Sequence, residues 1–462
     1  MYFERIYDED LAQASYIVGC QQTGEALVVD PLRDVDRYFS IAEHQGLRIT
    51  RVTETHIHAD YLSGARELAH AANARLLLSD EGGPDWQYAF DHEGLHHGDR
   101  IMLGKVAIDV VHTPGHTPEH ITFVITDTAA GDAPTMALTG DFVFVGDVGR
   151  PDLLEKAASI EGTQEVGARQ LYHSLQSIRE LPEYLAIWPG HGAGSACGKS
   201  LGAVPSTTLG YEGATSWAFR APDETSFVHQ ILEGQPEPPS YFGRMKVQNR
   251  QGPPILAGLP QPEELDPKTV EHLQREGAQI VDTRPKAEYT EGHIPGAFNI
   301  QADEGFSNWA GWTLHPDHPV VLVAPAERID DLVRGLIHVG IDSIAGYMPD
   351  MDVWSAAGHP VATLPHIAPR ELHQRAHEFA IIDVRGQDEW DAGHIEGAHH
   401  IHVGHLTRRL ADIPRDRPVA LHCQGGDRST LGASILQHEG YDNVYNVTGG
   451  LAAWEEQGLP IG

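Results

Sequence analysis

The C-terminal part of the chain, residues 262–462, contains two copies of one sequence unit, each about 100 residues long. Segments of the first copy recur in the second in the same order: Asp282-Thr283-Arg284 as Asp383-Val384-Arg385, Glu288-Tyr289 as Glu389-Trp390, and Gly292-His293-Ile294 as Gly393-His394-Ile395. The ends of the copies also correspond, because Gly340-Ile341-Asp342 and Trp354 match Gly440-Tyr441-Asp442 and Trp454. We therefore expect two small α/β domains, over residues 262–362 and 363–462.

The rest of the chain is long enough for one more domain, since 462 residues at about 150 per domain suggest three. Residues 1–232 alternate between strand-like and helix-like patterns, which predicts a sheet covered by helices. Residues 233–261 are rich in proline and polar residues and can continue neither pattern. We expect this stretch to be a linker between the first domain and the repeats.

Composition excludes several classes of function. The chain has 32 Lys and Arg against 66 Asp and Glu, a formal charge of −34, which is the wrong sign for binding nucleic-acid phosphates or an anionic membrane. It has no apolar run of about 18 residues and no secretion signal at its start. Its three cysteines, Cys20, Cys197 and Cys423, are too sparse for a disulfide framework. We expect a cytoplasmic protein without nucleic-acid or membrane partners.

Four segments of the first domain combine imidazoles and carboxylates near predicted strand ends. They are Thr55-His56-Ile57-His58-Ala59-Asp60-Tyr61, Thr113-Pro114-Gly115-His116-Thr117, Thr139-Gly140-Asp141 and Pro189-Gly190-His191-Gly192. Ligands from separate loops can converge on a metal while the sheet holds their geometry. With 29 histidines, any one of them can be an ordinary polar residue, but four such segments in this order favour a metal centre.

These segments resemble the pattern of the metallo-β-lactamase superfamily, His-x-His-x-Asp-His followed by His, Asp and His. The resemblance covers about residues 1–230 and implies an αββα sandwich. Tyr61 stands where a binuclear member has a histidine, and a phenol is a poor replacement for imidazole on zinc, so a second metal is disfavoured. The resemblance to the single-iron branch, the persulfide dioxygenases, implies one Fe(II) per chain on His56, His116 and Asp141.

The same resemblance gives roles to residues around the metal. It implies that His58, Asp60 and His191 orient ligands or substrate through hydrogen bonds, unless they are structural remnants. Arg150, in Gly149-Arg150-Pro151-Asp152, could pair with an anionic substrate, although a structural salt bridge is favoured. Cys197 follows His191 by six residues in a Gly/Ser-rich loop and is a candidate sulfur acceptor, the alternative being an inert thiol. We expect Cys20, in an apolar strand pattern, to be buried and unreactive.

A second chemical centre is predicted at Cys423. The apolar run 418–421 ends in His422-Cys423-Gln424-Gly425-Gly426-Asp427-Arg428-Ser429, and a helical pattern follows. Backbone N–H groups and a helix N-terminus favour a thiolate and could hold a persulfide. The segment resembles the rhodanese loop Cys-x-x-Gly-x-Arg-Ser/Thr, which implies parallel central sheets in both repeats and a catalytic Cys423 with Arg428. Ala324 takes the position of the cysteine in the first repeat, which we therefore expect to be inactive.

The order of these units resembles the bacterial fusions of a persulfide dioxygenase with a sulfurtransferase. The resemblance implies oxidation of a low-molecular-weight thiol persulfide by O2 to sulfite, sulfur transfer by Cys423 to give thiosulfate, and a role in sulfide detoxification. We also expect a homo-oligomer; the thiol carrier stays open. Two alternatives remain: a zinc thioesterase of the hydroxyacylglutathione hydrolase type, which usually uses two metals, and a sulfur-relay protein with an inert metal domain.

Overall fold

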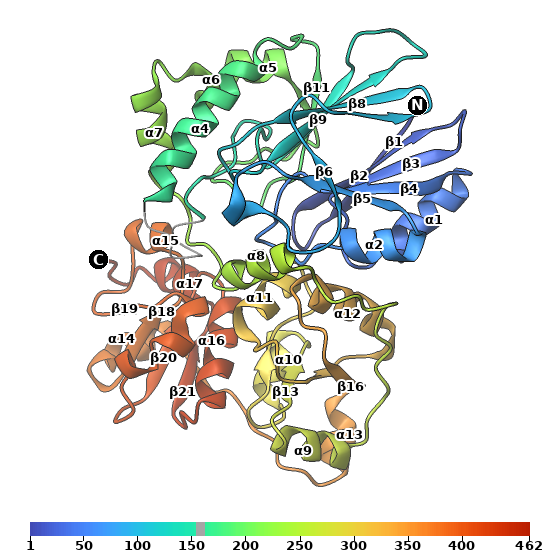
Figure 1. The fold of residues 1–462 in the computed structure, drawn as a ribbon. Helices are drawn as coiled ribbons and strands as arrows, with labels where there is room; N and C mark the ends of the chain where they lie inside the picture. The colour runs from blue at the N-terminus through green and yellow to red at the C-terminus, as the bar shows by residue number, and fades with distance from the viewer. Residues whose placement is uncertain (154–161) are drawn as a thin grey trace. The chain divides into compact units, whose positions relative to one another are not determined.

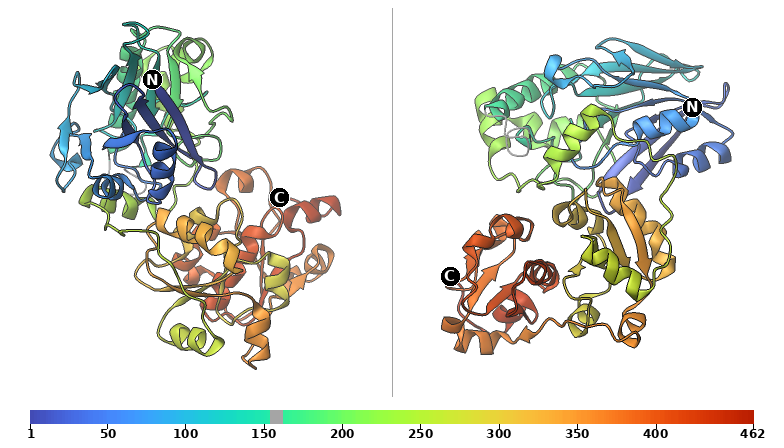
Figure 2. Two further views of the ribbon diagram at one scale, coloured as in Figure 1. Left: turned by 90° about the vertical axis from the view of Figure 1, so that its right-hand side faces the viewer. Right: turned by 60° about the horizontal axis from the view of Figure 1, so that its bottom comes forward.

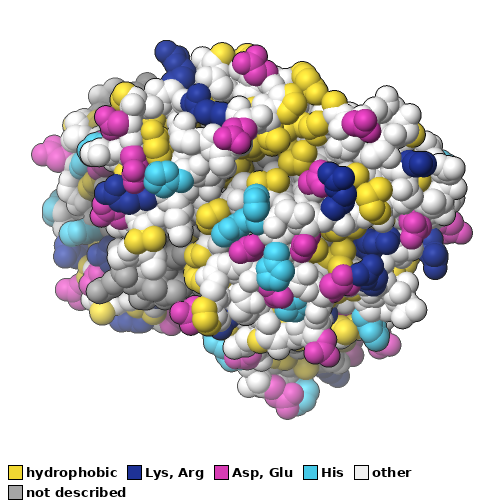
Figure 3. Space-filling model, turned by 45° about the horizontal axis from the view of Figure 1, so that its top comes forward, with side chains coloured by type: hydrophobic (Ala, Val, Ile, Leu, Met, Phe, Trp, Pro, Cys, Tyr) yellow, Lys and Arg dark blue, Asp and Glu magenta, His cyan; other side chains and the backbone are white. Residues whose placement is uncertain are grey.

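The computed structural model describes residues 1–153 and 162–462 (Figures 1 and 2). The chain divides into two compact units, residues 1–259 with 337–340 and residues 260–336 with 341–462. Among the described residues, no helix combines the length and the apolar character needed to cross a membrane. Acidic side chains and histidines are scattered over the face seen in Figure 3, in keeping with the formal charge of −34.

The first unit contains two six-stranded sheets. The first sheet has the order β1-β2-β3-β4-β5-β6, with antiparallel pairing from β1 to β3 and parallel pairing from β3 to β6. The second has the order β12-β11-β10-β9-β8-β7. The strands are β1 (Tyr2–Asp8), β2 (Gln13–Cys20), β3 (Glu25–Val29), β4 (Arg48–Thr53), β5 (Arg75–Ser79), β6 (Glu93–Leu95), β7 (Arg100–Leu103), β8 (Val106–His112), β9 (Ile121–Asp127), β10 (Met136–Gly140), β11 (Ala186–Pro189) and β12 (Thr207–Thr208).

Helices cover the outer faces of both sheets (Figure 1). Val18 and Phe123, one from each sheet, belong to the apolar cluster between the sheets. Ile17 faces the other way and packs in the cluster that includes α1 (Asp36–His44) and α2 (Ala65–Ala72), because successive strand residues point to opposite faces. The second sheet is covered in the same manner by α4 (Thr163–Ile178) and α7 (Glu224–Leu232). The expected αββα sandwich is confirmed.

The stretch expected to be a linker contains a helix, α8 (Phe242–Gln251). Phe242, Met245 and Asn249 are buried, at the spacing of one helical face. The prediction of a linker over 233–261 does not describe this helix, because no proline interrupts the residues between Pro239 and Pro253. Two shorter helices precede it, α5 (Leu209–Thr215) and α6 (Trp217–Arg220).

The second unit contains two all-parallel sheets, a four-stranded one of order β14-β13-β15-β16 and a five-stranded one of order β19-β18-β20-β21-β17, which repeats the first order and adds β17 at its edge. This confirms the prediction of two rhodanese-like α/β folds with parallel sheets. The strands are β13 (Gln279–Asp282), β14 (Phe298–Asn299), β15 (Val320–Val323), β16 (Ile344–Met348), β17 (His366–Ile367), β18 (Ala380–Asp383), β19 (His399–His400), β20 (Val419–His422) and β21 (Val444–Val447).

The register of the two sheets places corresponding residues of the repeats at the same site. Asp282 pairs with Val323 in the first repeat, and Asp383 pairs with His422 in the second. Ala324 and Cys423 therefore follow equivalent strands. The helices are α9 (Pro267–Arg275), α10 (Lys286–Glu291), α11 (Phe306–Thr313), α12 (Ile329–His338), α13 (Met351–Ala356), α14 (Pro369–Gln374), α15 (Gln387–Asp391), α16 (Asp427–His438) and α17 (Gly450–Glu456).

Candidate functional sites

Strand ends in the first unit bring His56, His116 and Asp141 together. His56 follows β4, His116 lies in the turn between β8 and β9, and Asp141 follows β10 directly. One ligand atom from each lies within 4.8 Å of the others, and all three residues are buried. The Nε2 atoms of His116 and His56 lie 3.5 and 3.9 Å from Oδ2 of Asp141. The arrangement offers two imidazoles and one carboxylate to a cation.

The hydrogen bonding of this group suits a metal ion. Nδ1 of His56 contacts the Thr55 hydroxyl at 2.9 Å, and Nδ1 of His116 donates to the Arg150 carbonyl at 2.9 Å. Nε2 of His56 and both carboxylate oxygens of Asp141 are buried without a hydrogen-bond partner, which is costly unless a cation satisfies them. Burial lowers the pKa of both imidazoles, that of His116 to about 3, so each keeps a lone pair for a metal.

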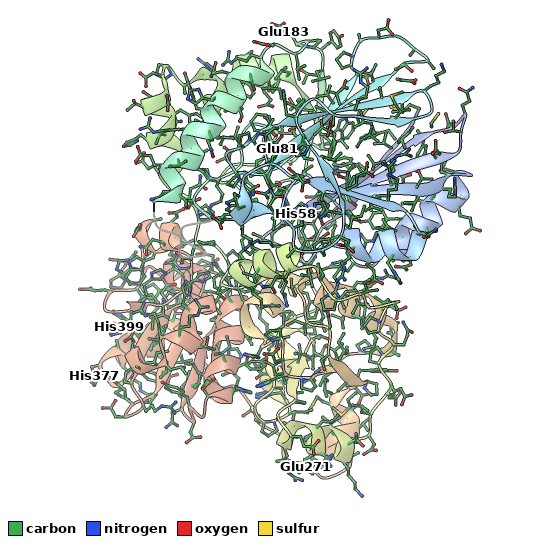
Figure 4. All side chains as sticks on the ribbon, viewed as in Figure 1. His58, Glu81, Glu183, Glu271, His377 and His399 are labelled. Atoms are coloured by element: carbon green, nitrogen blue, oxygen red, sulfur yellow. The ribbon has the colours of Figure 1, made fainter. Side chains whose placement is uncertain are left out.

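Asp30, which the sequence analysis missed, organises the loop behind these ligands. Its carboxylate accepts hydrogen bonds from the Thr55 backbone N–H at 2.7 Å and the Thr55 hydroxyl at 3.0 Å, and it contacts Nε2 of His58 at 3.0 Å. Burial alone would lower the pKa of His58, but Asp30 outweighs it and raises the pKa to about 9. His58 is therefore paired with Asp30 inside the first unit (Figure 4) and is not part of the three-residue group.

Tyr61 also contacts Asp30. Its hydroxyl lies 3.4 Å from the Asp30 carbonyl, to which it donates, and 3.3 Å from Nε2 of Gln13. Burial raises the pKa of Tyr61 well above its usual value, so the phenol stays protonated. The side chain is thus a hydrogen-bonding group in the interior and has no place among the candidate ligands.

His120 is a second residue that the sequence analysis missed. Its Nε2 accepts a hydrogen bond from the Asp141 backbone N–H at 3.2 Å, and its Nδ1 contacts the Thr113 hydroxyl at 2.9 Å. The sequence feature that could have identified it is its position four residues after the candidate ligand His116. Gly140 completes the turn at φ 48°, where a Cβ would lie 2.4 Å from the Thr55 hydroxyl, so only glycine fits there.

A second buried group, Asp60, His191 and Cys197, adjoins the first. Its ligand atoms lie within 4.8 Å of one another, and Nε2 of His191 lies 3.2 Å from Asp60 and 3.4 Å from Asp141. Burial, followed by the charges of Asp141 and Asp60, raises the pKa of the Cys197 thiol well above its usual value. Cys197 is close to the candidate metal ligands but is held as a neutral thiol. Cys20 is buried in β2 as expected. Burial alone would raise the pKa of its thiol, but hydrogen bonds from Lys105 and Thr23 outweigh burial and lower the pKa to about 7, which does not support the expectation of an unreactive thiol.

Arg150 supports the loops around these groups. Its guanidinium makes two hydrogen bonds of 2.7 Å to Asp152 and one of 3.2 Å to the Ala196 carbonyl. Its backbone N–H donates to the Cys197 carbonyl at 3.2 Å, and its own carbonyl accepts from His116. These contacts agree with the structural salt bridge that was favoured over substrate binding.

The first unit contains a cavity of about 390 Å³. Ile57, between His56 and His58, forms part of its wall, together with Trp86, Lys246 and Arg250. The Lys246 ammonium lies 3.7 Å from the centre of the Trp86 ring. Burial lowers the pKa of Lys246 to about 7, against the opposing effect of Glu119. The cavity wall thus combines Lys246, Arg250, the acid Asp85 and an indole with Ile57, the chain neighbour of the candidate ligand His56.

The other centre is Cys423, which directly follows β20 and is buried. Its sulfur accepts a hydrogen bond from the Gly426 backbone N–H at 3.0 Å and lies 3.5 Å from the Ser429 hydroxyl. The N-terminal residues of α17 fix the backbone of this loop, since the Leu451 N–H donates a hydrogen bond to the Cys423 carbonyl at 2.8 Å. Gly450 has φ 59°, and a Cβ there would meet that carbonyl at 2.4 Å.

Arg428 lies at the other end of the same loop. Its guanidinium forms two hydrogen bonds with Glu389, one of them 2.8 Å long, and these raise the pKa of Arg428. The hydrogen bonds also lower the pKa of Glu389. Arg428 is therefore anchored to the helix α15 rather than bonded to the sulfur.

Comparison with known proteins agrees with this fold. Residues 8–191 match the profile of the metallo-β-lactamase superfamily, and residues 266–348 and 368–457 each match that of the rhodanese-like domain. The crystal structure of a metallo-β-lactamase from Staphylococcus aureus is 41% identical, with a TM-score of 0.68, over 76% of this chain and 99% of that one. The chain belongs to the metallo-β-lactamase superfamily. Within it, this chain joins the superfamily's domain to two rhodanese-like domains.

Two further relatives within the superfamily bear on the metal centre. The mitochondrial persulfide dioxygenase ETHE1 of Homo sapiens is 32% identical over 181 residues, 38% of this chain and 63% of that protein. A hydroxyacylglutathione hydrolase of Methylobacillus flagellatus is 31% identical over 179 residues, 38% of this chain and 62% of that protein. The chain thus spans less than two thirds of the length of these relatives.

Proposed function

We propose that the chain is a non-haem Fe(II) persulfide dioxygenase joined to a sulfurtransferase, acting in sulfide detoxification. It oxidises a low-molecular-weight thiol persulfide with O2 to sulfite, and Cys423 transfers sulfane sulfur to sulfite to give thiosulfate. The observation that carries the proposal is the buried group of His56, His116 and Asp141 with its unpartnered ligand atoms. Similarity to persulfide dioxygenases supports iron in particular. One Fe(II) per chain, a cytoplasmic location and a homo-oligomer remain predictions.

In the oxidation, the protein holds the metal ion and orients its ligands and the substrate. Bound iron would supply redox chemistry and open coordination positions for O2 and a sulfur ligand. Thr55 and the Arg150 carbonyl fix the two imidazoles through their Nδ1 atoms, so that both Nε2 atoms face one point. Burial of all three ligands keeps bulk water out.

The cavity beside Ile57 is the proposed position of the thiol carrier. The wall carries Lys246 and Arg250 against one acid, Asp85, which favours a carrier with carboxylate or phosphate groups. Glutathione and coenzyme A both meet this requirement. We propose Asp60 and His191 as groups that position the substrate, and Cys197 as a sulfur acceptor only if its proton is removed first.

Sulfur transfer follows from the surroundings of Cys423. Its thiolate attacks the sulfane sulfur of a persulfide, which forms the Cys423 persulfide and releases the carrier thiolate. Sulfite then takes the terminal sulfur, which gives thiosulfate and restores the Cys423 thiolate. The Gly426 N–H and the Ser429 hydroxyl stabilise negative charge on the Cys423 sulfur when it is a thiolate. Ala324 lacks a sulfur atom, so the first repeat performs no such transfer.

The test is anaerobic purification with metal analysis, followed by measurement of O2 uptake when a thiol persulfide is added. The proposal expects about one iron per chain and persulfide-dependent uptake. The Cys423→Ser variant should lose thiosulfate formation and keep most of its O2 uptake. Absence of O2 uptake in the iron-loaded protein would refute the dioxygenase part, and loss of both activities in a folded Cys423→Ser variant would refute independent centres.

The second candidate is a binuclear zinc hydrolase of the hydroxyacylglutathione hydrolase type. The group of Asp60, His191 and Cys197 favours it, because these residues could hold a second ion next to the first. Tyr61 argues against it, since its phenol is protonated and hydrogen bonded to Asp30. Two zinc ions per chain with cleavage of a glutathione thioester would establish this alternative.

A further inference from the structure

The inactive repeat contacts the loop that carries Cys423. Lys286, at the start of α10, donates a hydrogen bond of 3.0 Å to the Gly425 carbonyl, and its ammonium lies 2.8 Å from the Asp427 carboxylate. Gln301, also from the first repeat, donates to the same carboxylate at 3.3 Å. Its side-chain oxygen accepts from the Lys286 backbone N–H at 2.7 Å, so the two residues act as one brace.

This contact belongs to an interface within the second unit. The Asn299 backbone N–H donates to the Ser434 hydroxyl at 3.0 Å, and His438 donates to the Gly296 carbonyl at 2.8 Å. The rings of Phe298 and His438 also stack, with their centres 4.3 Å apart. Because these contacts link the first repeat to the helix α16, they fix the position of Lys286 relative to the loop in front of that helix.

Lys286 also places a positive charge next to the loop of residues 423–428. A Cβ on Gly426 would lie 3.5 Å from the Lys286 ammonium, and Gly426 donates the N–H that bonds to the Cys423 sulfur. Arg428, the cation within the loop, is paired with Glu389. The Asp427 carboxylate would repel an anion arriving at the loop, and Lys286 neutralises it. Sulfite and thiosulfate are both dianions, so this compensation matters for the reaction proposed above.

We propose that the inactive repeat is a working part of the sulfur-transfer centre, in which Lys286, braced by Gln301, is a positioning residue for residues 423–428 and an attractor for the anionic sulfur acceptor. The inference rests on the proposed role of Cys423 as sulfur carrier. Lys286 does not touch the reacting sulfur; it acts through the Gly425 carbonyl, the Asp427 carboxylate and the local field.

The test is the full-length Lys286→Met variant, which removes the charge and keeps most of the side-chain length. A pair about 3 Å apart at the surface is worth roughly a three- to tenfold effect. We expect KM for sulfite to rise by about that factor, with a smaller change in kcat and a weaker salt dependence of kcat/KM. Lys286→Arg should restore most of the loss. Lys268→Met, in the same repeat on an exposed helix start, should match the wild type.

A second readout does not depend on sulfur transfer. The rate at which Cys423 is alkylated, followed by mass spectrometry of its peptide across pH, reports the thiolate, and Lys286→Met should shift that profile upward. Gln301→Leu, which keeps the charge and removes the brace, should give a smaller effect in the same direction and replaces Lys286→Met if that variant does not fold.

Unchanged KM, salt dependence and alkylation profile in a folded Lys286→Met variant would overturn the inference. A uniform loss of kcat without a change in KM or salt dependence would also overturn it, since that is the result of a merely structural role. If the wild type itself transfers no sulfur, the proposed function fails, while the alkylation profile still decides whether Lys286 acts on Cys423.

Discussion

Replacing Asn249 by alanine should loosen the loop that carries the metal ligands. Asn249 is buried in α8, and its side-chain amide donates to the carbonyls of His58 and Tyr61, both at 2.8 Å. Its oxygen accepts from the Ser63 backbone N–H at 2.9 Å. Three hydrogen bonds from one side chain therefore hold the segment that follows His56.

The size of the effect follows from those bonds. A hydrogen bond contributes about 1 kcal/mol net, and the backbone groups left behind are buried, so the loss is about 3 kcal/mol. Alanine has a higher helix propensity than asparagine, which offsets about 0.5 kcal/mol of this loss. The free energy of local opening of the segment after His56 should therefore be lower by about 2.5 kcal/mol in the variant. This corresponds to a change of roughly 60-fold in the opening equilibrium.

Hydrogen exchange measured by mass spectrometry is the appropriate assay, because it reports local opening in a protein with several domains. Amides of residues 57–64 should exchange about 60-fold faster in Asn249→Ala, when reclosing outpaces exchange. Peptides from the second unit serve as an internal reference. Val247→Ala is the matched control, since Val247 lies on the same helix with 51% of its side chain exposed.

Iron content provides an independent measurement on the same variant. A loosened loop should bind iron more weakly, so that less chelator is needed to remove it from Asn249→Ala than from the wild type or Val247→Ala. Wild-type exchange at residues 57–64 together with wild-type resistance to chelation would refute the reasoning that α8 holds the metal loop.

Three further predictions concern charged groups and ligands. His56→Ala should lose bound iron and O2 uptake, measured by metal analysis and an oxygen electrode, while Cys423 still forms thiosulfate from added persulfide and sulfite. Lys246→Met should raise KM several-fold for a glutathione persulfide and much less for the persulfide of an uncharged thiol; equal effects on both would contradict an electrostatic role. Because hydrogen bonds from Arg428 lower the pKa of Glu389, this pair should stabilise the fold above about pH 4.3 and stop doing so as the pH falls through the lower folded pKa. Thermal unfolding between pH 3 and 6 should therefore depend less on pH in Glu389→Gln than in the wild type.

The sequence was sufficient to predict the sandwich, the two parallel sheets and the convergence of His56, His116 and Asp141. His56, His116 and Asp141 each lie next to a strand end, so that correct recognition of the strands already brings them to one edge of the fold. The repeat in residues 262–462 predicts two copies of one parallel sheet, and the equivalent positions of Ala324 and Cys423 follow from alignment of the copies.

The supporting residues could not be predicted, because their contacts depend on packing between distant segments. Asp30 directly follows a hairpin strand and accepts hydrogen bonds from Thr55, 25 residues further along the chain. Asn249 is 191 residues from His58, in a stretch whose prolines suggested a linker. Nothing in the sequence indicates the proposed role of Lys286, since that role depends on contacts between the two repeats.

The two cysteines proposed to handle sulfur differ in their surroundings, and this difference argues for a division of labour. The sulfur of Cys423 accepts a hydrogen bond from the Gly426 N–H, in a loop that contains Arg428 and contacts Lys286 of the first repeat. Cys197 lies next to Asp60 and Asp141, whose charges, together with burial, disfavour a thiolate. A cation bound by Asp141 would reduce that repulsion, so Cys197 should become more acidic when metal is present, whereas Cys423 should not respond. Alkylation of both peptides with and without iron compares them directly, and an equal response of the two thiols would contradict this assignment.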